Sequence, residues 1–493
     1  MTTIFDLEAD RLSVRCANAR LDESRPLTAA DESRFRGWIQ DYHRSQQGHG
    51  DDASRLRLGR ALYAWLDGGE GWLTRARATA VAPWTVEFRA PLDPGDAIRW
   101  LLQLPWELLA DARGYLAADL ALRYAPVRRL GKPTAPEQAS QYRLSLVFMA
   151  AAPRDQPALN FETEEAAILD ATEKAGLDLT VEDSGALDWL AACVAREAPD
   201  VVHLSCHGRG GGEPALCLET EEGATDMASV GRLVGELSAH RPRLLFLSAC
   251  HTAESAETGD GMGIVDSLAL SLLRAGTPAV LGWDGPVADA EATEFAAHLY
   301  RQLARKADLA SALAEARFAL LNRPAAEPRS RDWHLARLFL GPTGGGRLTQ
   351  GERARHRRGV EGGHKEFLDA KGQQVPVPGR REFVGRRRPL QDALRALRRR
   401  DHVGVLIHGM GRQGKSSLAA RVANRLNHHQ PVVVFGRYDA PAILEAFVRA
   451  LGGREARDIV EAYRDRVRQH PDELAEGLRA LLEGPCREEI KDG

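Results

Sequence analysis

The stretch Leu244–Thr252, which reads LLFLSACHT, decides the fold that we expect for this chain. An apolar run is followed by small residues and then by Cys250 and His251. A short apolar run of this kind is typical of a strand that is buried on both faces, as in a parallel sheet. We therefore expect a buried strand that ends at a cysteine.

A second stretch has the same design. Val201–Gly208, which reads VVHLSCHG, is an apolar run that ends with Cys206, His207 and a glycine. Ligands of open α/β sheets bind outside the carboxyl ends of the strands, so a histidine and a cysteine at two such ends predict a reactive site. A neighbouring imidazole lowers the pKa of a thiol and activates it as a nucleophile. We therefore predict that His207 and Cys250 form a catalytic dyad.

The backbone beside this dyad predicts how a reacting carbonyl would be stabilised. Gly208 has no side chain, so a substrate can approach the main chain closely at this position. The backbone N–H groups of Gly208 and Cys250 are therefore the predicted oxyanion donors.

Three other residues near the dyad carry the same chemical groups. His203 lies in the middle of its strand and His251 is adjacent to the cysteine, and we expect both to be structural. Cys206 should face the opposite side of its strand from His207, because side chains alternate along a strand.

The composition predicts a globular protein with more than one domain. The chain has 493 residues, 44% of them hydrophobic and 27% charged, with a formal net charge of −3. This length favours two or three domains. The charge gives no sign of a nucleic-acid partner, and no apolar run is long enough to span a membrane. Six irregularly spaced cysteines and the absence of an apolar signal core predict free thiols in the cytoplasm.

Strand and helix patterns alternate regularly from residue 142 onward. Such alternation predicts right-handed βαβ units, and hence an α/β fold with a mostly parallel sheet and helices on both faces. A segment rich in glycine and charge then predicts a linker. The expected segments are an N-terminal extension (1–54), the first part of the core region (55–141), the α/β core (142–345), the linker (346–381) and a C-terminal α/β domain (382–493).

Five motifs resemble those of CHAT-domain proteases, which are relatives of caspases and separases. The resemblance covers roughly residues 55–345 and implies a caspase-like fold. It also implies a cysteine endopeptidase that cleaves a protein substrate without a cofactor, with His207 as the catalytic histidine and Cys250 as the nucleophile. The alternative is an inactive CHAT-like fold that serves as the interaction module of a nucleotide-dependent switch. The matching motifs are LPWELLAD (104–111), VVHLSCHG (201–208), LLFLSACHT (244–252), AGTPAVLGW (275–283) and WHLARLFLG (333–341).

The segment after the fourth motif departs from the family pattern. WDGPVADAE (283–291) stands where the family has a Trp-Pro-Val-Asp-Asp segment. By the resemblance, Asp284 and Asp289 lie near the pocket for the residue before the cut, and an acidic floor would favour Arg or Lys. Their alternative is a solvated acid or a helix cap. Self-cleavage at the basic clusters 353–358 and 379–388 is a further hypothesis, and its alternative is a solvated charge run.

A phosphate-binding loop is predicted in the C-terminal part. GMGRQGKS (409–416) fits the pattern GxxxxGK[ST], follows the apolar run VGVLIHG and precedes a helical pattern. Glycines let backbone N–H groups surround phosphates, Lys415 reaches the β- and γ-phosphates, and Ser416 can hold Mg²⁺. We therefore predict that ATP and Mg²⁺ bind here. The predicted nucleotide-binding residues of the loop are Gly409, Gly411, Gly414, Lys415, Ser416 and Ser417.

Together with the upstream FVGR, this loop resembles the STAND class of signalling NTPases, which includes NACHT and NB-ARC proteins. The resemblance implies that FVGR helps to seat the adenine and that the module oligomerises and switches the protease on, in bacterial defence or cell-death signalling. No acidic Walker B strand follows the loop, since PVVVFGRYD (431–439) comes too early, so we expect a partial P-loop domain that does not hydrolyse ATP alone. The FVGR residues are Phe383, Val384, Gly385 and Arg386.

Overall fold

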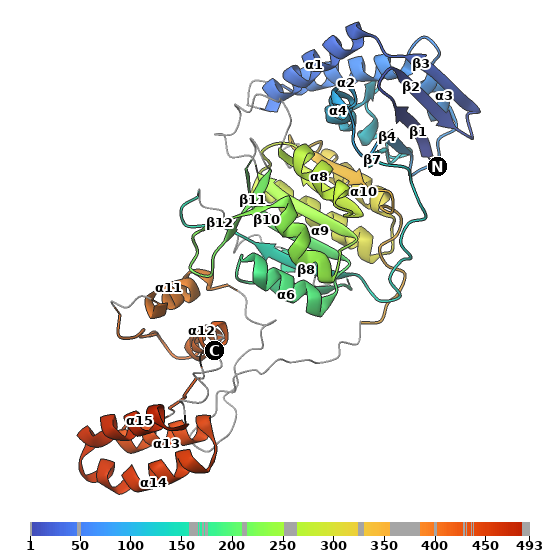
Figure 1. Ribbon diagram of the computed structural model, residues 1–493. Coiled ribbons are helices and arrows are strands. Elements are labelled where there is room, and N and C mark those ends of the chain that lie inside the picture. Colours follow the sequence, from blue (N-terminus) through green and yellow to red (C-terminus); the bar gives the residue numbers. More distant parts are fainter. Residues whose placement is uncertain are drawn as a thin grey trace. The chain divides into compact units, whose positions relative to one another are not determined.

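The protein is described by a computed structural model, in which two compact units, Met1–Arg357 and Arg358–Gly493, are distinguished (Figure 1). The described residues are 2–46, 51–156, 166, 168–169, 172, 176–209, 214–250, 264–323, 330–354, 385–398, 402–426, 429, 431–434, 436 and 438–485.

Within the described part of the first unit, thirteen strands form one sheet. The strand order is β12-β11-β10-β13-β14-β15-β7-β4-β1-β2-β3, and β8 and β9 lie beside β10. A separate two-stranded ribbon consists of β5 (Ala110–Asp111) and β6 (Gly114–Tyr115). The strands of the large sheet are β1 (Thr2–Leu7), β2 (Arg11–Cys16), β3 (Leu21–Pro26), β4 (Thr85–Ala90), β7 (Ala125–Leu130), β8 (Ser145–Ala150), β9 (Asp178–Glu182), β10 (Val201–Arg209), β11 (Ala215–Glu219), β12 (Thr225–Ser229), β13 (Leu244–Cys250), β14 (Ala279–Trp283) and β15 (Ala336–Leu340).

The centre of this sheet is parallel, as predicted. Strands β9, β8, β10, β13 and β14 run parallel to one another, and β15 is antiparallel to β14. One edge of β10 is shared by two partners: Val201–Ser205 pairs with β8, whereas His207–Arg209 pairs with the antiparallel hairpin β11–β12. The sheet therefore divides just before His207.

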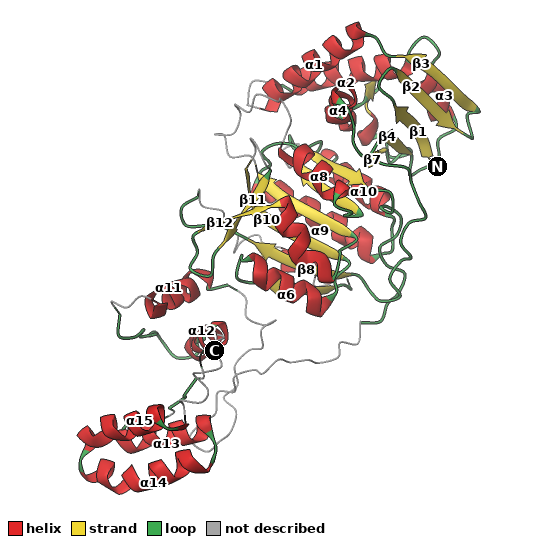
Figure 2. Cartoon of the chain, viewed as in Figure 1, coloured by secondary structure: helices red, strands yellow, loops and turns green. Residues whose placement is uncertain are grey.

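Helices cover both faces of the sheet, which confirms the α/β class (Figure 2). Alternate residues of β13 show the two faces: Leu245 lines a small cavity with Leu233 and Leu272, whereas Phe246 packs against Phe295 with ring centroids 6.3 Å apart. Thus α7 and α8 lie on one face and α9 on the other. The helices are α1 (Ala29–Arg44), α2 (Asp52–Asp67), α3 (Trp72–Ala78), α4 (Asp96–Gln103), α6 (Leu187–Glu197), α7 (Val230–Glu236), α8 (Ile264–Arg274), α9 (Asp289–Ala304) and α10 (Leu309–Leu321).

The N-terminal segment contains three strands that the sequence analysis did not predict. Its strands β1–β3 belong to the large sheet, because β1 pairs in parallel with β4. These strands are difficult to predict from the sequence, because only a few apolar residues, such as Phe5 and Leu7 in β1, show the alternation of a strand. The helix that follows these strands, α1, begins after Thr28. The Thr28 side chain accepts a hydrogen bond from the Asp31 backbone in a capping box.

The second unit is helical in its described part, and this corrects the α/β sheet expected there. Segments 403–408 and 431–434 form neither helix nor strand. Val403 and Leu406 are exposed. An apolar segment becomes a buried strand only where another strand pairs with it, and no such pairing is present for the described residues of these segments. No described helix of either unit is long and apolar enough to cross a membrane. The helices are α11 (Arg387–Arg398), α12 (Lys415–Arg425), α13 (Ala440–Leu451), α14 (Arg454–Gln469) and α15 (Leu474–Glu483).

Candidate active site

The two residues predicted as a dyad lie in register on neighbouring strands. Strands β10 and β13 are parallel, and their paired positions run from Val201 with Leu244 to His207 with Cys250. Paired positions on neighbouring strands share a face of the sheet. The histidine and cysteine positions therefore lie side by side at the carboxyl end of the sheet. The structure confirms the parallel strands with level ends that the prediction required.

The row that contains the dyad continues across the hairpin. His207 is in register with Cys217 of β11, which is in register with Met227 of β12. The Cys217 thiol donates to the Met227 sulfur at 3.6 Å. Burial raises the pKa of the Cys217 thiol. This second thiol beside His207 was not predicted, because pairing with the hairpin cannot be read from the alternation of β10 alone.

The next row below the dyad consists of small polar residues. Ser205 is in register with Ser248, and both are buried. The indole Nε1 of Trp283, the last residue of β14, donates to Ser248 Oγ at 3.1 Å. This bond ties the end of β14 to β13, two residues before Cys250.

The row below the serines is aromatic and contains His203. Its ring stacks on Phe246 at 4.2 Å and contacts the edge of Phe148 at 5.1 Å. Burial lowers the pKa of His203 to about 3, so the ring is neutral at physiological pH. His203 is thus part of the packed interior, as predicted. Cys206 belongs to the apolar core of the other face, also as predicted.

The predicted oxyanion donors remain predictions. Gly208 is buried in β10, in register with Leu216. Cys250 is the last residue of β13, and His251 lies outside the described residues.

The two predicted pocket acids have different surroundings. Asp284 directly follows β14, is buried, and forms an ion pair with Arg337 of β15. Its carboxylate is therefore paired with an internal cation, and its role as the acidic floor of a pocket stays a prediction. Asp289 is exposed and is the first residue of α9, which fits its alternative as a solvated acid; the cap of this helix is Ala288 and not Asp289.

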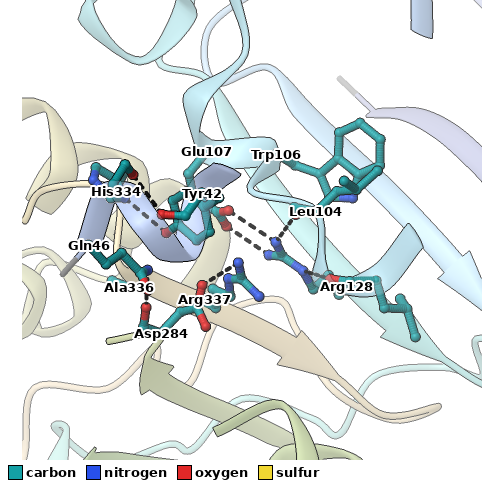
Figure 3. A network of polar contacts seen from close by, with 12 residues as sticks. Tyr42, Gln46, Leu104, Trp106, Glu107, Arg128, Asp284, His334, Ala336 and Arg337 are labelled. Atoms are coloured by element: carbon teal, nitrogen blue, oxygen red, sulfur yellow. Dashed lines mark hydrogen bonds and ion pairs between the residues drawn. The ribbon is translucent and has the colours of Figure 1, made fainter. Parts of the chain in front are cut away.

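A buried charge network lies beside this ion pair (Figure 3). The Glu107 carboxylate accepts hydrogen bonds from Arg128 at 2.7 and 3.0 Å and from Arg317 at 3.3 Å. All three side chains are almost completely buried. Burial alone would raise the pKa of Glu107, but these arginines and Arg337 lower it to about 2. The carboxylate is therefore ionised and fully compensated.

This network explains two of the motifs that were recognised in the sequence. Glu107 belongs to LPWELLAD, and Arg337 and His334 belong to WHLARLFLG. Arg128 also donates to the backbone carbonyls of Leu102 and Leu104. The two motifs thus meet around buried charges and join the strands near the site. Sequence reasoning missed this role, because buried arginines look like surface residues in sequence.

The loop that was predicted to bind phosphate leads directly into α12. The Lys415 ammonium donates to the backbone carbonyls of Gly409 at 2.9 Å and Met410 at 2.7 Å. Gly414 has φ 76°, and the guanidinium carbon of Arg386 lies 4.0 Å from the point that a Cβ at Gly414 would occupy. Ser416 and Ser417 lie in the first turn of α12. The structure therefore brings Arg386 to this loop.

Several predicted features cannot be placed. Phe383 and Val384 lie outside the described residues, as do residues 355–358 and 379–384 of the two basic clusters. Within the described residues, no group of three or more His, Cys, Asp or Glu side chains could hold a metal ion.

The fold and the dyad define an α/β protein whose central parallel strands bring a histidine and a cysteine into register. The CHAT domain family model matches residues 92–341, about half of the chain. The chain therefore belongs to the CHAT-domain family.

Two solved structures are similar over much of the chain. The complex of the pro- and mature domains of Porphyromonas gingivalis RgpB is 11% identical with a TM-score of 0.35, and the similarity covers 66% of this chain and 78% of that one. The Arg-specific cysteine proteinase gingipain R is 10% identical with a TM-score of 0.34, and the similarity covers 64% and 75%. No curated protein has a significant sequence match to the chain.

Proposed function

We propose that this protein is a cysteine endopeptidase that uses His207 and Cys250. The observation that carries the proposal is the register of these two residues at the carboxyl ends of adjacent parallel strands. Membership of the CHAT-domain family supports the same activity. The proposed activity does not depend on the Asp284–Arg337 ion pair.

The chemistry needs only the two residues and the nearby backbone. The Cys250 thiolate attacks the carbonyl carbon of the substrate, and the C–N bond breaks as the His207 imidazolium gives its proton to the leaving amine. The resulting thioester is hydrolysed by a water molecule that His207 deprotonates. The backbone N–H groups of Gly208 and Cys250 are the proposed donors to the oxyanion in both steps.

The proposal is tested by labelling with a peptidyl thiol electrophile, followed by intact-mass measurement. We expect one adduct in the wild type, none in Cys250→Ala, and at least about 100-fold slower labelling in His207→Ala. Cys217→Ala is the matched control, because it removes the neighbouring thiol of the same row and should still be labelled. An unlabelled wild-type protein would contradict the proposal and favour the alternative, an inactive interaction module.

Cleavage after basic residues is a proposal of its own. A substrate Arg or Lys could reach the Asp284 carboxylate only by replacing Arg337 as its counter-ion. A peptide-library profile tests this proposal, and a profile without basic preference contradicts it. The same profile would show whether the basic linker clusters are suitable sites for self-cleavage.

We also propose that the second unit is a STAND-like module that binds ATP with Mg²⁺ and regulates the peptidase. This is supported by the Lys415 ammonium, which lies over loop carbonyls at the start of α12, and by the nearby Arg386. When bound, ATP would supply phosphates to Lys415, and Mg²⁺ would bind to Ser416.

Binding of a fluorescent ATP analogue to the full chain tests this second proposal. We expect Lys415→Ala to weaken binding at least about tenfold, because the charge-assisted contact to the phosphates is lost. Arg457→Ala, on α14, is the charge-matched control and should bind normally. Equal affinities for the two variants would contradict phosphate binding by the loop. An unchanged rate of Cys250 labelling on addition of ATP would contradict regulation.

A further inference from the structure

Helix α1 lies before the region that matches the CHAT family, yet its carboxyl end contacts the candidate site. The Gln46 side chain, just after α1, donates through Nε2 to the backbone carbonyl of Asp284. Tyr42 is buried, and its hydroxyl is 3.1 Å from Nδ1 of His334. The guanidinium of Arg337 lies 5.7 Å from the centre of the Tyr42 ring. Figure 3 shows these side chains together.

The segment that Gln46 contacts is the turn between β14 and α9, residues 284–288. The paired positions of β13 and β14 run from Leu245 with Val280 to Leu247 with Gly282. If the same register is continued, Asp284 comes level with Ala249, next to Cys250. The turn therefore starts near the carboxyl end of β13, which carries the proposed nucleophile.

This turn is held by contacts from the family-matched region, among them the Asp284–Arg337 ion pair, and by a hydrogen bond from Gln46, which lies outside that region. Within that region, the Asp284 N–H donates to the Leu335 carbonyl at 2.8 Å, and the Ala288 N–H donates to Asp332 at 3.0 Å. The Asp284 carbonyl is bonded by Gln46. Gly285 has φ 139°, and a Cβ there would lie 3.1 Å from Gln46 Nε2. The glutamine amide is thus packed closely against the turn.

We propose that Gln46, supported by Tyr42, is a positioning residue that holds the 284–288 turn in place beside the dyad. The inference rests on the proposed peptidase function and adds to it a part of the chain that the family match does not include. Gln46 bonds the backbone of the turn, so the proposal assigns it to the entry of the substrate and not to the reactivity of the thiol.

The test compares Gln46→Ala with Gln40→Ala, which removes the same side chain from an exposed position of α1. Both variants keep the core of the helix. We expect Gln46→Ala to raise KM for a peptide substrate about five- to tenfold, as for the loss of one hydrogen bond, with little change in kcat. Alkylation of Cys250 by iodoacetamide should keep its wild-type rate and pH profile, because this small reagent does not need the turn.

Hydrogen exchange of the full-length protein provides a readout that does not depend on activity. Amides of residues 284–288 should exchange at least about five times faster in Gln46→Ala than in Gln40→Ala. Equal exchange in the two variants would overturn the proposal, and so would equal KM values. If the wild type itself neither cleaves peptides nor reacts at Cys250, the proposed function fails. The exchange difference would then still show that Gln46 holds the turn, so the two failures are distinguishable.

Discussion

The dyad row and the Glu107 network are two polar groupings of the same unit, and they are built in opposite ways. The network joins charges of opposite sign, and Glu107 is bonded to both Arg128 and Arg317 in the interior. The dyad row places the positions of His207 and Cys250 in register at the carboxyl ends of two strands. Compensated buried charges contribute to the fold, whereas a thiol beside an imidazole contributes reactivity. The comparison predicts that loss of the first costs stability and loss of the second costs activity.

The largest expected effect is on catalysis. Cys250→Ala and His207→Ala should each lower kcat/KM by about 1,000-fold or more, because the nucleophile or its proton carrier is absent. Neither residue belongs to the Glu107 network, so the free energy of unfolding should fall by less than about 2 kcal/mol. Peptide cleavage and urea unfolding of the same preparations measure the two quantities. A variant that loses activity and also unfolds would remove the distinction drawn here.

The converse effect is expected for Glu107→Gln. Without the carboxylate, the buried guanidinium groups of Arg128 and Arg317 lose their counter-charge, which costs about 3–5 kcal/mol. Urea unfolding measures the loss, with Glu236→Gln on the exposed face of α7 as the matched control, expected within about 0.5 kcal/mol of the wild type. If Glu107→Gln were as stable as this control, the network would not have the structural role assigned to it.

These two groupings also differ in how far they could be predicted from sequence. His207 and Cys250 were identified because each ends a short apolar run, and the order of strands and helices implied a parallel sheet. Their register and the neighbouring Cys217 could not be predicted, because they depend on which strand pairs with which. The Glu107 network has no local pattern, since its arginines come from β7, α10 and β15. Only tertiary packing shows that they meet.

The second unit shows another reason why local sequence pattern does not predict every strand. Residues 403–408 have the apolar character of a strand, but their described conformation is not a strand, and Leu406 is exposed. A strand depends on backbone partners elsewhere in the chain, whereas a helix satisfies its own backbone. Helix α12 was accordingly predicted correctly, and the sheet before it was not.

Acid should weaken the interior around both groupings. Burial lowers the pKa values of His203 and His334 to about 3. The unfolded chain binds these protons near pH 6.5, so it holds more protons than the folded chain between about pH 6.5 and 3, and stability falls as the pH falls. Each histidine should cost about 2 kcal/mol at pH 5. The Glu107 carboxylate adds a loss of the same sign below about pH 4.5, because its folded pKa is about 2.

His203→Leu tests this pH dependence, because the variant lacks one of the two buried imidazoles. The difference in unfolding free energy between pH 7.5 and pH 5 should be about 2 kcal/mol smaller than in the wild type. The stabilities of the variant and the wild type at pH 7.5, where buried imidazoles are neutral, give the cost of any packing defect. An unchanged pH dependence would show that His203 is not shielded from protons in the folded protein.

The smallest effect is expected for substitution of Cys217, which lies in the dyad row but has a buried thiol with a raised pKa. Its thiol is buried, donates to Met227 at 3.6 Å and has a raised pKa. It therefore stays protonated at neutral pH, whereas the proposed mechanism needs the thiolate form of Cys250. Cys217→Ser should change kcat/KM less than about threefold and stability by about 1 kcal/mol, since one buried thiol is exchanged for a hydroxyl. Cys250→Ser measured alongside should be inactive. If Cys217→Ser were inactive as well, Cys217 would be needed for activity in spite of its raised pKa. The reactive group would then include the whole row from Cys250 to Met227 and not only His207 and Cys250.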